Sequence, residues 1–232
     1  FEWLRKAPWG NPAFAGMFMS LVFFGFIGGI SGVVMGTEQI NLIMHNTLYV
    51  PGHFHGTVVA GTTLAFMAIT YYLIPLIFRR EIKFMALAKL QPYLFGIGVA
   101  GISVFMMGAG TLGVSRRHWD MQFADAVLPF DYPSAAFLMM GLNGMFAVLA
   151  AIGGIAFVVV VVGSVFFGRK LEKDEKPSYP EVPPQAAVVA QHGSAESLKI
   201  PGTTMLVAIF FIAFVLYYFV NWKYLSEIWP LS

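Results

Sequence analysis

Five long apolar runs, none containing Asp, Glu, Lys or Arg, dominate this chain of 232 residues. About 20 consecutive apolar residues cross the hydrocarbon core of a bilayer as an α-helix. The runs cover roughly residues 13–35, 53–78, 90–113, 134–168 and 201–222. They predict an all-α integral membrane protein with five transmembrane helices.

The composition agrees with a membrane protein and narrows the possible chemistry. Only 11% of the residues are charged, whereas a soluble domain carries roughly 25%. Cys is absent, so disulfides, thiolate metal sites and a cysteine nucleophile are excluded. The net charge of +2 is spread along the connecting segments, which indicates no nucleic-acid partner.

The distribution of basic residues predicts the orientation in the membrane. With a cytoplasmic N-terminus, eleven of the 14 Lys and Arg residues lie on the inner side, and Arg116, Arg117 and Lys223 lie outside. Cytoplasmic loops normally carry this excess of positive charge. We therefore expect a multi-pass protein of a prokaryotic plasma membrane. Its predicted parts are a four-helix region (1–168), a cytoplasmic polar linker (169–200), and a fifth helix with an outer C-terminus (201–232).

A histidine cluster, HNTLYVPGHFH over residues 45–55, begins the second apolar run. Histidines at membrane depth suggest function, because lipid cannot satisfy their ring nitrogens. On an α-helix, His53 and His55 project about 200° apart, so they cannot easily chelate one ion. They favour two cofactors, and haem fits best because each iron needs an axial nitrogen. Satisfaction of both rings by carbonyls or water, with no cofactor, is the alternative.

The pair Arg116-Arg117 breaks the charge pattern on the same outer side as the histidines. Guanidinium groups bind anions such as haem propionates through charge-assisted hydrogen bonds. The alternative partners are the carboxylates of the same loop, Asp120, Asp125 and Asp131.

These features resemble subunit I of the haem-copper oxygen reductases. KAPWGNPAF, HNTLYVPGHFH, GVSRRHW and DYPSAAF look like its C-terminal part, closest to the B-type branch, and the similarity covers essentially the whole chain. The resemblance implies a five-helix portion of a larger bundle of twelve or more helices. It also implies a terminal oxidase that reduces oxygen to water and translocates protons.

The resemblance assigns roles to individual residues. His53 matches the ligand of the high-spin haem iron, His55 matches a ligand of the low-spin haem iron, and Phe54 lies between the haems. The propionate region is matched by His45, Asn41, Arg116 and Arg117. The B-type pattern tends to have an acid where this chain has Asn41, which cannot carry a proton as a carboxylate does; Glu38 could substitute if the loop folds back.

The same resemblance places several essential groups outside this chain. The copper ligands, the crosslinked tyrosine and the second low-spin haem ligand belong to preceding helices, so the chain needs those subunit I helices as a partner. It would be half of a split subunit or a fragment. Subunit II, membrane lipid and an electron donor (cytochrome c, a copper protein or quinol) are the other expected partners. Two alternatives stay open: a nitric oxide reductase of the same superfamily, and a non-catalytic membrane anchor or haem electron carrier.

Overall fold

A computed structural model describes residues 2–117, 132–172 and 175, together with scattered residues between 208 and 223. The chain divides into two units, Phe1–Pro183 and Pro184–Ser232. The predicted linker (169–200) and fifth helix (201–222) fall almost wholly outside the described residues, so both stay predictions.

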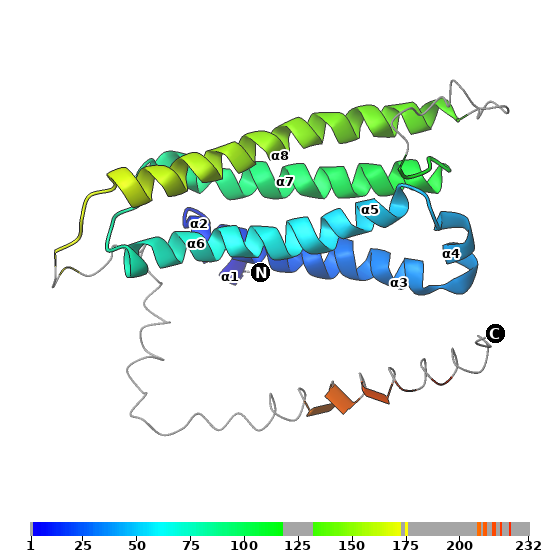
Figure 1. The fold of residues 1–232 in the computed structure, drawn as a ribbon, viewed down its shortest axis with the longest axis horizontal. Coiled ribbons are helices and arrows are strands. Elements are labelled where there is room, and N and C mark those ends of the chain that lie inside the picture. The colour runs from blue at the N-terminus through cyan, green and yellow to red at the C-terminus, as the bar shows by residue number, and fades with distance from the viewer. Residues whose placement is uncertain are drawn as a thin grey trace, which may run out of the picture. The chain divides into compact units, whose positions relative to one another are not determined.

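Four helices in the described residues are long and apolar enough to cross a membrane: Pro12–Gly36, Tyr49–Ile77, Met85–Thr111 and Ser134–Phe167. The first consists of α2 (Pro12–Val22), the π-helix η1 (Phe23–Gly29) and α3 (Ile30–Gly36). The second consists of α5 (Tyr49–Phe54), the π-helix η2 (His55–Thr63) and α6 (Leu64–Ile77). The third is α7 (Met85–Thr111), the fourth is α8 (Ser134–Phe167), and short helices α1 (Glu2–Lys6) and α4 (Glu38–Met44) lie outside the spans (Figure 1).

The predicted all-α membrane class is confirmed: helices dominate the described residues, which contain isolated β-bridges but no strand. Two spans start earlier than the apolar runs indicate. α7 begins at Met85 and continues through the exposed Lys89, because one charge does not end a helix whose backbone must remain hydrogen-bonded. α5 begins at Tyr49, where the Thr47 hydroxyl accepts a bond from the Tyr49 amide at 3.2 Å. His53 therefore lies in the second turn of its helix.

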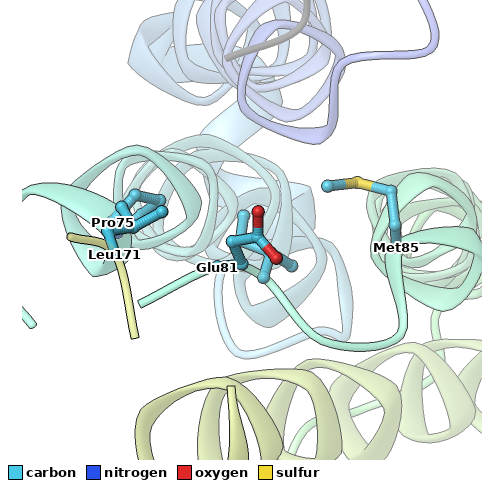
Figure 2. Close-up of a pocket in the computed structure, with 5 residues that line it drawn as sticks. Pro75, Glu81, Met85 and Leu171 are labelled. Carbon is cyan, nitrogen blue, oxygen red and sulfur yellow. The ribbon is translucent and has the colours of Figure 1, made fainter. Parts of the chain in front are cut away.

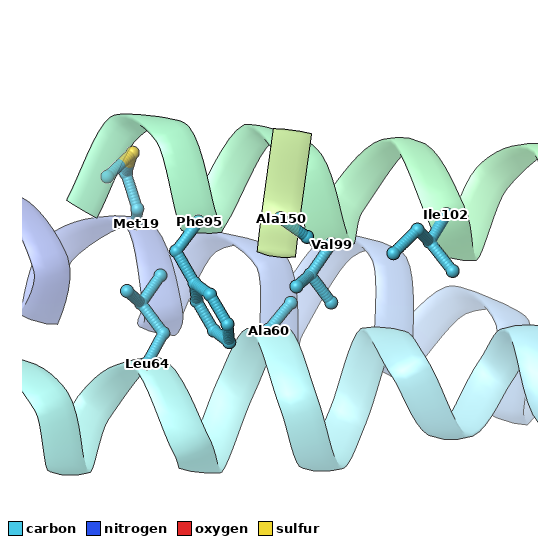
Figure 3. Close-up of a cluster of buried hydrophobic side chains, with 7 residues drawn as sticks. All are labelled: Met19, Ala60, Leu64, Phe95, Val99, Ile102 and Ala150. Atoms are coloured by element: carbon cyan, nitrogen blue, oxygen red, sulfur yellow. The ribbon is translucent and has the colours of Figure 1, made fainter. Parts of the chain in front are cut away.

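The four spans pack around α7. It runs along α8 for most of its length, and α5 and η2 cover another side (Figure 1). α2 packs against α6 and α7, and η1 packs against η2. Figure 3 shows the largest apolar cluster, to which all four spans contribute: Met19, Ala60, Leu64, Phe95, Val99, Ile102 and Ala150.

Much of the remaining apolar surface of these helices is exposed. Val33 and Ile155, for example, are 74% and 65% exposed. A soluble protein would not expose so many large apolar side chains. The outer faces therefore suit lipid and the other helices of a larger bundle.

One buried polar pair connects α6 with α7. The Tyr71 hydroxyl donates to Gln91 Oε1 at 3.0 Å, and the Gln91 amide contacts the Met67 sulfur at 3.4 Å. Tyr71 is 2% exposed and Gln91 is fully buried. The pair satisfies side-chain groups that lipid could not, so it favours one register of these two helices.

The loop between α6 and α7 is joined to the segment after α8 by a backbone bridge and ion pairs. Arg80 and Lys170 form an antiparallel bridge, and Arg169 makes ion pairs with Glu81 and Glu175. The hydrogen bond from Arg169 lowers the pKa of the Glu81 carboxyl below its ordinary value. A pocket of about 220 Å³ lies beside this junction, lined by Pro75, Glu81, Ile82, Met85 and Leu171 (Figure 2).

Glycines allow α5 and α7 to approach at backbone distance. A Cβ at Gly110 would lie 2.0 Å from the Tyr49 amide nitrogen, and one at Gly52 would lie 2.8 Å from the Met107 nitrogen. The Ser103 hydroxyl also donates to the Gly52 carbonyl at 2.7 Å. These contacts hold the helix that carries the histidines against α7.

Replacing Gly110 with Ala should therefore separate the two helices. We expect a loss of roughly 1–3 kcal/mol, the usual cost of overpacking, measured as a lower thermal midpoint of the purified intact complex. Gly141→Ala is the control, because a Cβ there meets nothing within 4 Å. Equal midpoints for the two variants would show that the close approach is not required.

Candidate functional site

His53 and His55 lie where α5 becomes the π-helix η2. π-Helical turns occur often at functional sites. Gly52, Gly56 and Ala60 form the buried line of this helix. His53 and His55 are half-buried on the two sides of that line, as the predicted angle of about 200° requires.

Phe54 lies between the two histidines on the outward side of the helix. It is 52% exposed, and its ring centroid is 5.6 Å from that of His53. The structure thus brings the three predicted residues into one turn, with an aromatic ring between two imidazoles that point in different directions.

Each histidine ring has its Nδ1 occupied within the protein. His55 Nδ1 lies 2.7 Å from the Pro51 carbonyl oxygen, which can only accept, so Nδ1 carries the proton. His53 Nδ1 lies 2.8 Å from the Ser31 hydroxyl. An imidazole whose Nδ1 donates in this way presents an unprotonated Nε2, the form that binds a metal.

The space beside His53 is preserved by a glycine. A Cβ at Gly32 on α3 would lie 3.2 Å from His53 Cε1 and 3.9 Å from Nε2. A larger residue would press on the edge of the ring next to the ligating nitrogen. The unprotonated Nε2 fits a cofactor whose metal is held by one histidine.

No group of three or more His, Cys, Asp or Glu side chains able to hold a metal ion occurs in the part of the chain that the structure describes. What the two histidines offer is one nitrogen on each side of a helix. That donor set fits the axial position of a haem iron, whose other ligands come from the macrocycle.

The loop that enters α5 is paired with the segment that follows α7. Thr47 forms an antiparallel bridge with Ser115, and the Arg116 amide donates to the Asn46 carbonyl at 2.8 Å. Arg116 Nη2 and Nε also donate to Asn46 Oδ1 at 2.8 and 3.2 Å. The predicted arginine therefore lies beside the histidine loop, at the same end of the bundle.

The other residues predicted for this end of the bundle lie in or next to α4 and directly after Arg116. Asn41 is half-buried in α4, and His45 caps that helix and is exposed. Glu38 opens α4 and lies one turn before Asn41, so helical spacing places the two on one side. Arg117 follows with a left-handed backbone, φ 69°. The alternative carboxylate partners Asp120, Asp125 and Asp131 lie outside the described residues.

Sequence inspection missed four residues that shape this site: Ser31, Gly32, Asn46 and Thr47. Ser31 is a hydroxyl in an apolar run, which was a usable signal, because polar groups at membrane depth need partners. The roles of Gly32, Asn46 and Thr47 depend on which segments lie opposite them, so no local pattern indicates them.

Comparison with known proteins identifies the family. The family model described as cytochrome c and quinol oxidase polypeptide I matches residues 1–142. The chain belongs to this family, subunit I of the haem-copper oxidases. The resemblance inferred from the sequence is thereby confirmed, while its closeness to the B-type branch stays a prediction.

Individual relatives agree with this membership. Cytochrome c oxidase subunit 1 of Thermus thermophilus is 35% identical over 198 residues, which cover 82% of this chain and 32% of the relative. Cytochrome c oxidase polypeptide 1 of Halobacterium salinarum is 36% identical over 43% of this chain and 17% of its own length. A solved structure of a heme-copper terminal oxidase dimer matches with a TM-score of 0.61 and 32% identity, over 73% of this chain and 29% of that one. The chain thus spans about a third or less of each of these subunits.

Asn46 offers a test of the junction between the histidine loop and Arg116. Its φ is 65°, so Asn46→Gly removes only the side-chain bonds from Arg116 to Asn46 Oδ1, whereas Asn46→Ala also leaves a Cβ in the left-handed region. We expect Ala to be less stable than Gly by about 1 kcal/mol, measured as thermal midpoints of the intact complex. If Ala matched the original protein, neither the left-handed turn nor the bonds from Arg116 would contribute to stability.

Proposed function

We propose that this chain is the haem-ligating C-terminal portion of the catalytic subunit of a respiratory terminal oxidase. The complete enzyme reduces oxygen to water, passes electrons from a low-spin to a high-spin haem, and couples this transfer to proton translocation. One observation carries the proposal: a single helical turn presents two imidazoles to opposite sides, each with its Nδ1 already bonded. Family membership supports it.

The haem ligands follow from that arrangement. His53 ligates the high-spin haem iron and His55 ligates the low-spin one, an order taken from the family resemblance. A haem bound here would supply reversible one-electron chemistry and a place for oxygen to bind. The protein orients each ligand: Gly32 keeps space at the His53 ring, and the Pro51 carbonyl fixes the His55 ring. Phe54 occupies the position between the two cofactors.

The outer end of the bundle supplies the groups for the propionates. Arg116 and Arg117 provide positive charge, and His45 and Asn41 provide polar side chains on the adjoining loop. The Asn46 amide engages two of the N–H groups of Arg116, of the five that a guanidinium carries. This bond aims the guanidinium before any anion binds. Glu38, one turn from Asn41, is a carboxylate of the described residues on this side and the candidate for proton exchange.

The rest of the catalytic centre comes from partners. The copper ligands and the second low-spin haem ligand belong to the other subunit I helices, and subunit II and lipid complete the complex. The names of the relatives favour cytochrome c as the electron donor, while the family description also includes quinol oxidases. Those names also favour an oxidase over a nitric oxide reductase. Metal analysis of the intact complex separates these two, because only the oxidase requires copper.

Substitution of each histidine tests the ligand assignment. His53→Ala in the intact complex should abolish oxygen reduction and the carbon monoxide-sensitive high-spin signal, while the low-spin signal largely remains. His55→Ala should instead remove the low-spin signal. Reduced-minus-oxidised spectra with and without carbon monoxide measure both effects. His192→Ala, in the predicted linker, is the control. Two normal haem signals in both variants would refute the assignment.

We also propose that the N-terminus is cytoplasmic and that the histidine pair lies near the outer surface, as the distribution of basic residues favours. Because the chain has no Cys, single cysteines report on orientation without a background from this chain. A membrane-impermeant thiol reagent should label Gln39→Cys in intact cells and Lys170→Cys only after lysis. Both original residues are exposed. The reverse labelling pattern would invert the topology.

A further inference from the structure

Ser31 is a buried hydroxyl on α3 that faces the His53 ring. It is 4% exposed, and its Oγ lies 2.8 Å from His53 Nδ1. The same oxygen bonds the Ile27 carbonyl and lies 3.1 Å from the Gly28 carbonyl. Three polar atoms therefore surround one hydroxyl group.

The hydroxyl has one proton to give, and this decides the direction of every bond. Both carbonyl oxygens can only accept, so the Ser31 proton points to the backbone of its own helix. The remaining lone pair of Oγ then accepts the proton of His53 Nδ1. Ser31 thus selects the tautomer of His53 that leaves Nε2 unprotonated.

Close helix packing holds Ser31 in this position. Gly28 and Gly56 lie where η1 meets the α5–η2 helix: a Cβ at Gly56 would lie 3.5 Å from the Gly28 nitrogen, and one at Gly28 would lie 2.5 Å from Thr57 Cγ2. The backbone of η1 is therefore in contact with the helix that carries His53. Ser31 follows η1 by two residues, so its hydroxyl has little freedom to move away from the ring.

The two histidines are supported in different ways. His55 donates to the Pro51 carbonyl of its own helix, a partner that no side-chain substitution removes. His53 donates across a helix interface to a side chain. The Ser31 hydroxyl is therefore a partner of this ligand that a single substitution can remove.

We propose that Ser31 is a positioning residue for the high-spin haem ligand: it orients the His53 ring and, by accepting the Nδ1 proton, increases electron donation from Nε2 to iron. The inference rests on the proposed role of His53. Partners in this outer position orient a ligating histidine and raise its basicity. A hydroxyl is a weaker acceptor than a carboxylate, so the effect is a moderate adjustment.

Three substitutions at Ser31 in the intact oxidase complex test the proposal. Ser31→Ala removes the acceptor, Ser31→Cys replaces it with a weak one, and Ser31→Thr retains a hydroxyl that bonds the preceding turn in the same way. The matched control is Ser20→Ala on α2. Ser20 is also 4% exposed, and its hydroxyl donates to the Met17 carbonyl at 2.9 Å, with no bond to a histidine.

The primary readout is the iron–histidine stretching frequency of the reduced high-spin haem, measured by resonance Raman spectroscopy. We expect a lower frequency in Ser31→Ala, an intermediate one in Ser31→Cys, and the original frequency in Ser31→Thr and Ser20→Ala. The midpoint potential of the same haem should rise in Ser31→Ala, because a less basic ligand stabilises ferric iron less. The low-spin signal should not change, since Ser31 does not contact His55.

An unchanged frequency in both the Ala and Cys variants would overturn the role of Ser31, as would a shift of equal size in Ser20→Ala. The His53→Ala variant separates this failure from failure of the proposed function. If it retains the high-spin haem, the ligand assignment itself is wrong. If it loses that haem while Ser31→Ala shows no shift, only the inference about Ser31 fails.

Discussion

The backbone contact of the α5–η2 helix with its neighbours is the constraint on which the rest of the site depends. Gly52 and Gly110 allow α5 to touch α7, and Gly28 and Gly56 allow η2 to touch η1. A helix held this closely on two sides cannot rotate about its axis. His53 and His55 consequently keep fixed directions relative to the neighbouring helices, while the helical period sets the angle between them.

Polar side chains inside the spans also join neighbouring helices. Ser103 bonds the Gly52 carbonyl, Tyr71 bonds Gln91, and Ser31 bonds His53. Each bond joins two different spans and satisfies groups that lipid would leave unpaired. The membrane interior makes these few bonds selective, since a shifted register would lose the bond between the two spans. The bundle thus combines close glycine packing with a small number of specific polar contacts.

Much of the fold was accessible from the sequence because a membrane imposes a simple rule on helix length and apolarity. The first and fourth spans begin and end within one residue of the predicted runs. The rule fails at helix ends, which depend on local bonds. α5 starts at Tyr49, four residues before the predicted run, where the Thr47 hydroxyl accepts a bond from the Tyr49 amide. α7 starts at Met85, before Lys89, although the predicted run starts after this charged residue. The short helix α4 was not foreseen, since it lies outside the apolar runs, where that rule gives no signal.

The sequence by itself determined the membrane class, the separation of His53 from His55 and the family, because these depend on composition, helical period and motif. Only the tertiary structure decided what each residue faces. It placed Arg116 on Asn46, Ser31 on His53 and Gly32 beside the ligating edge of that ring. These pairs are separated by 70, 22 and 21 positions in the chain. Such contacts arise from the packing of whole helices, and no local pattern records them.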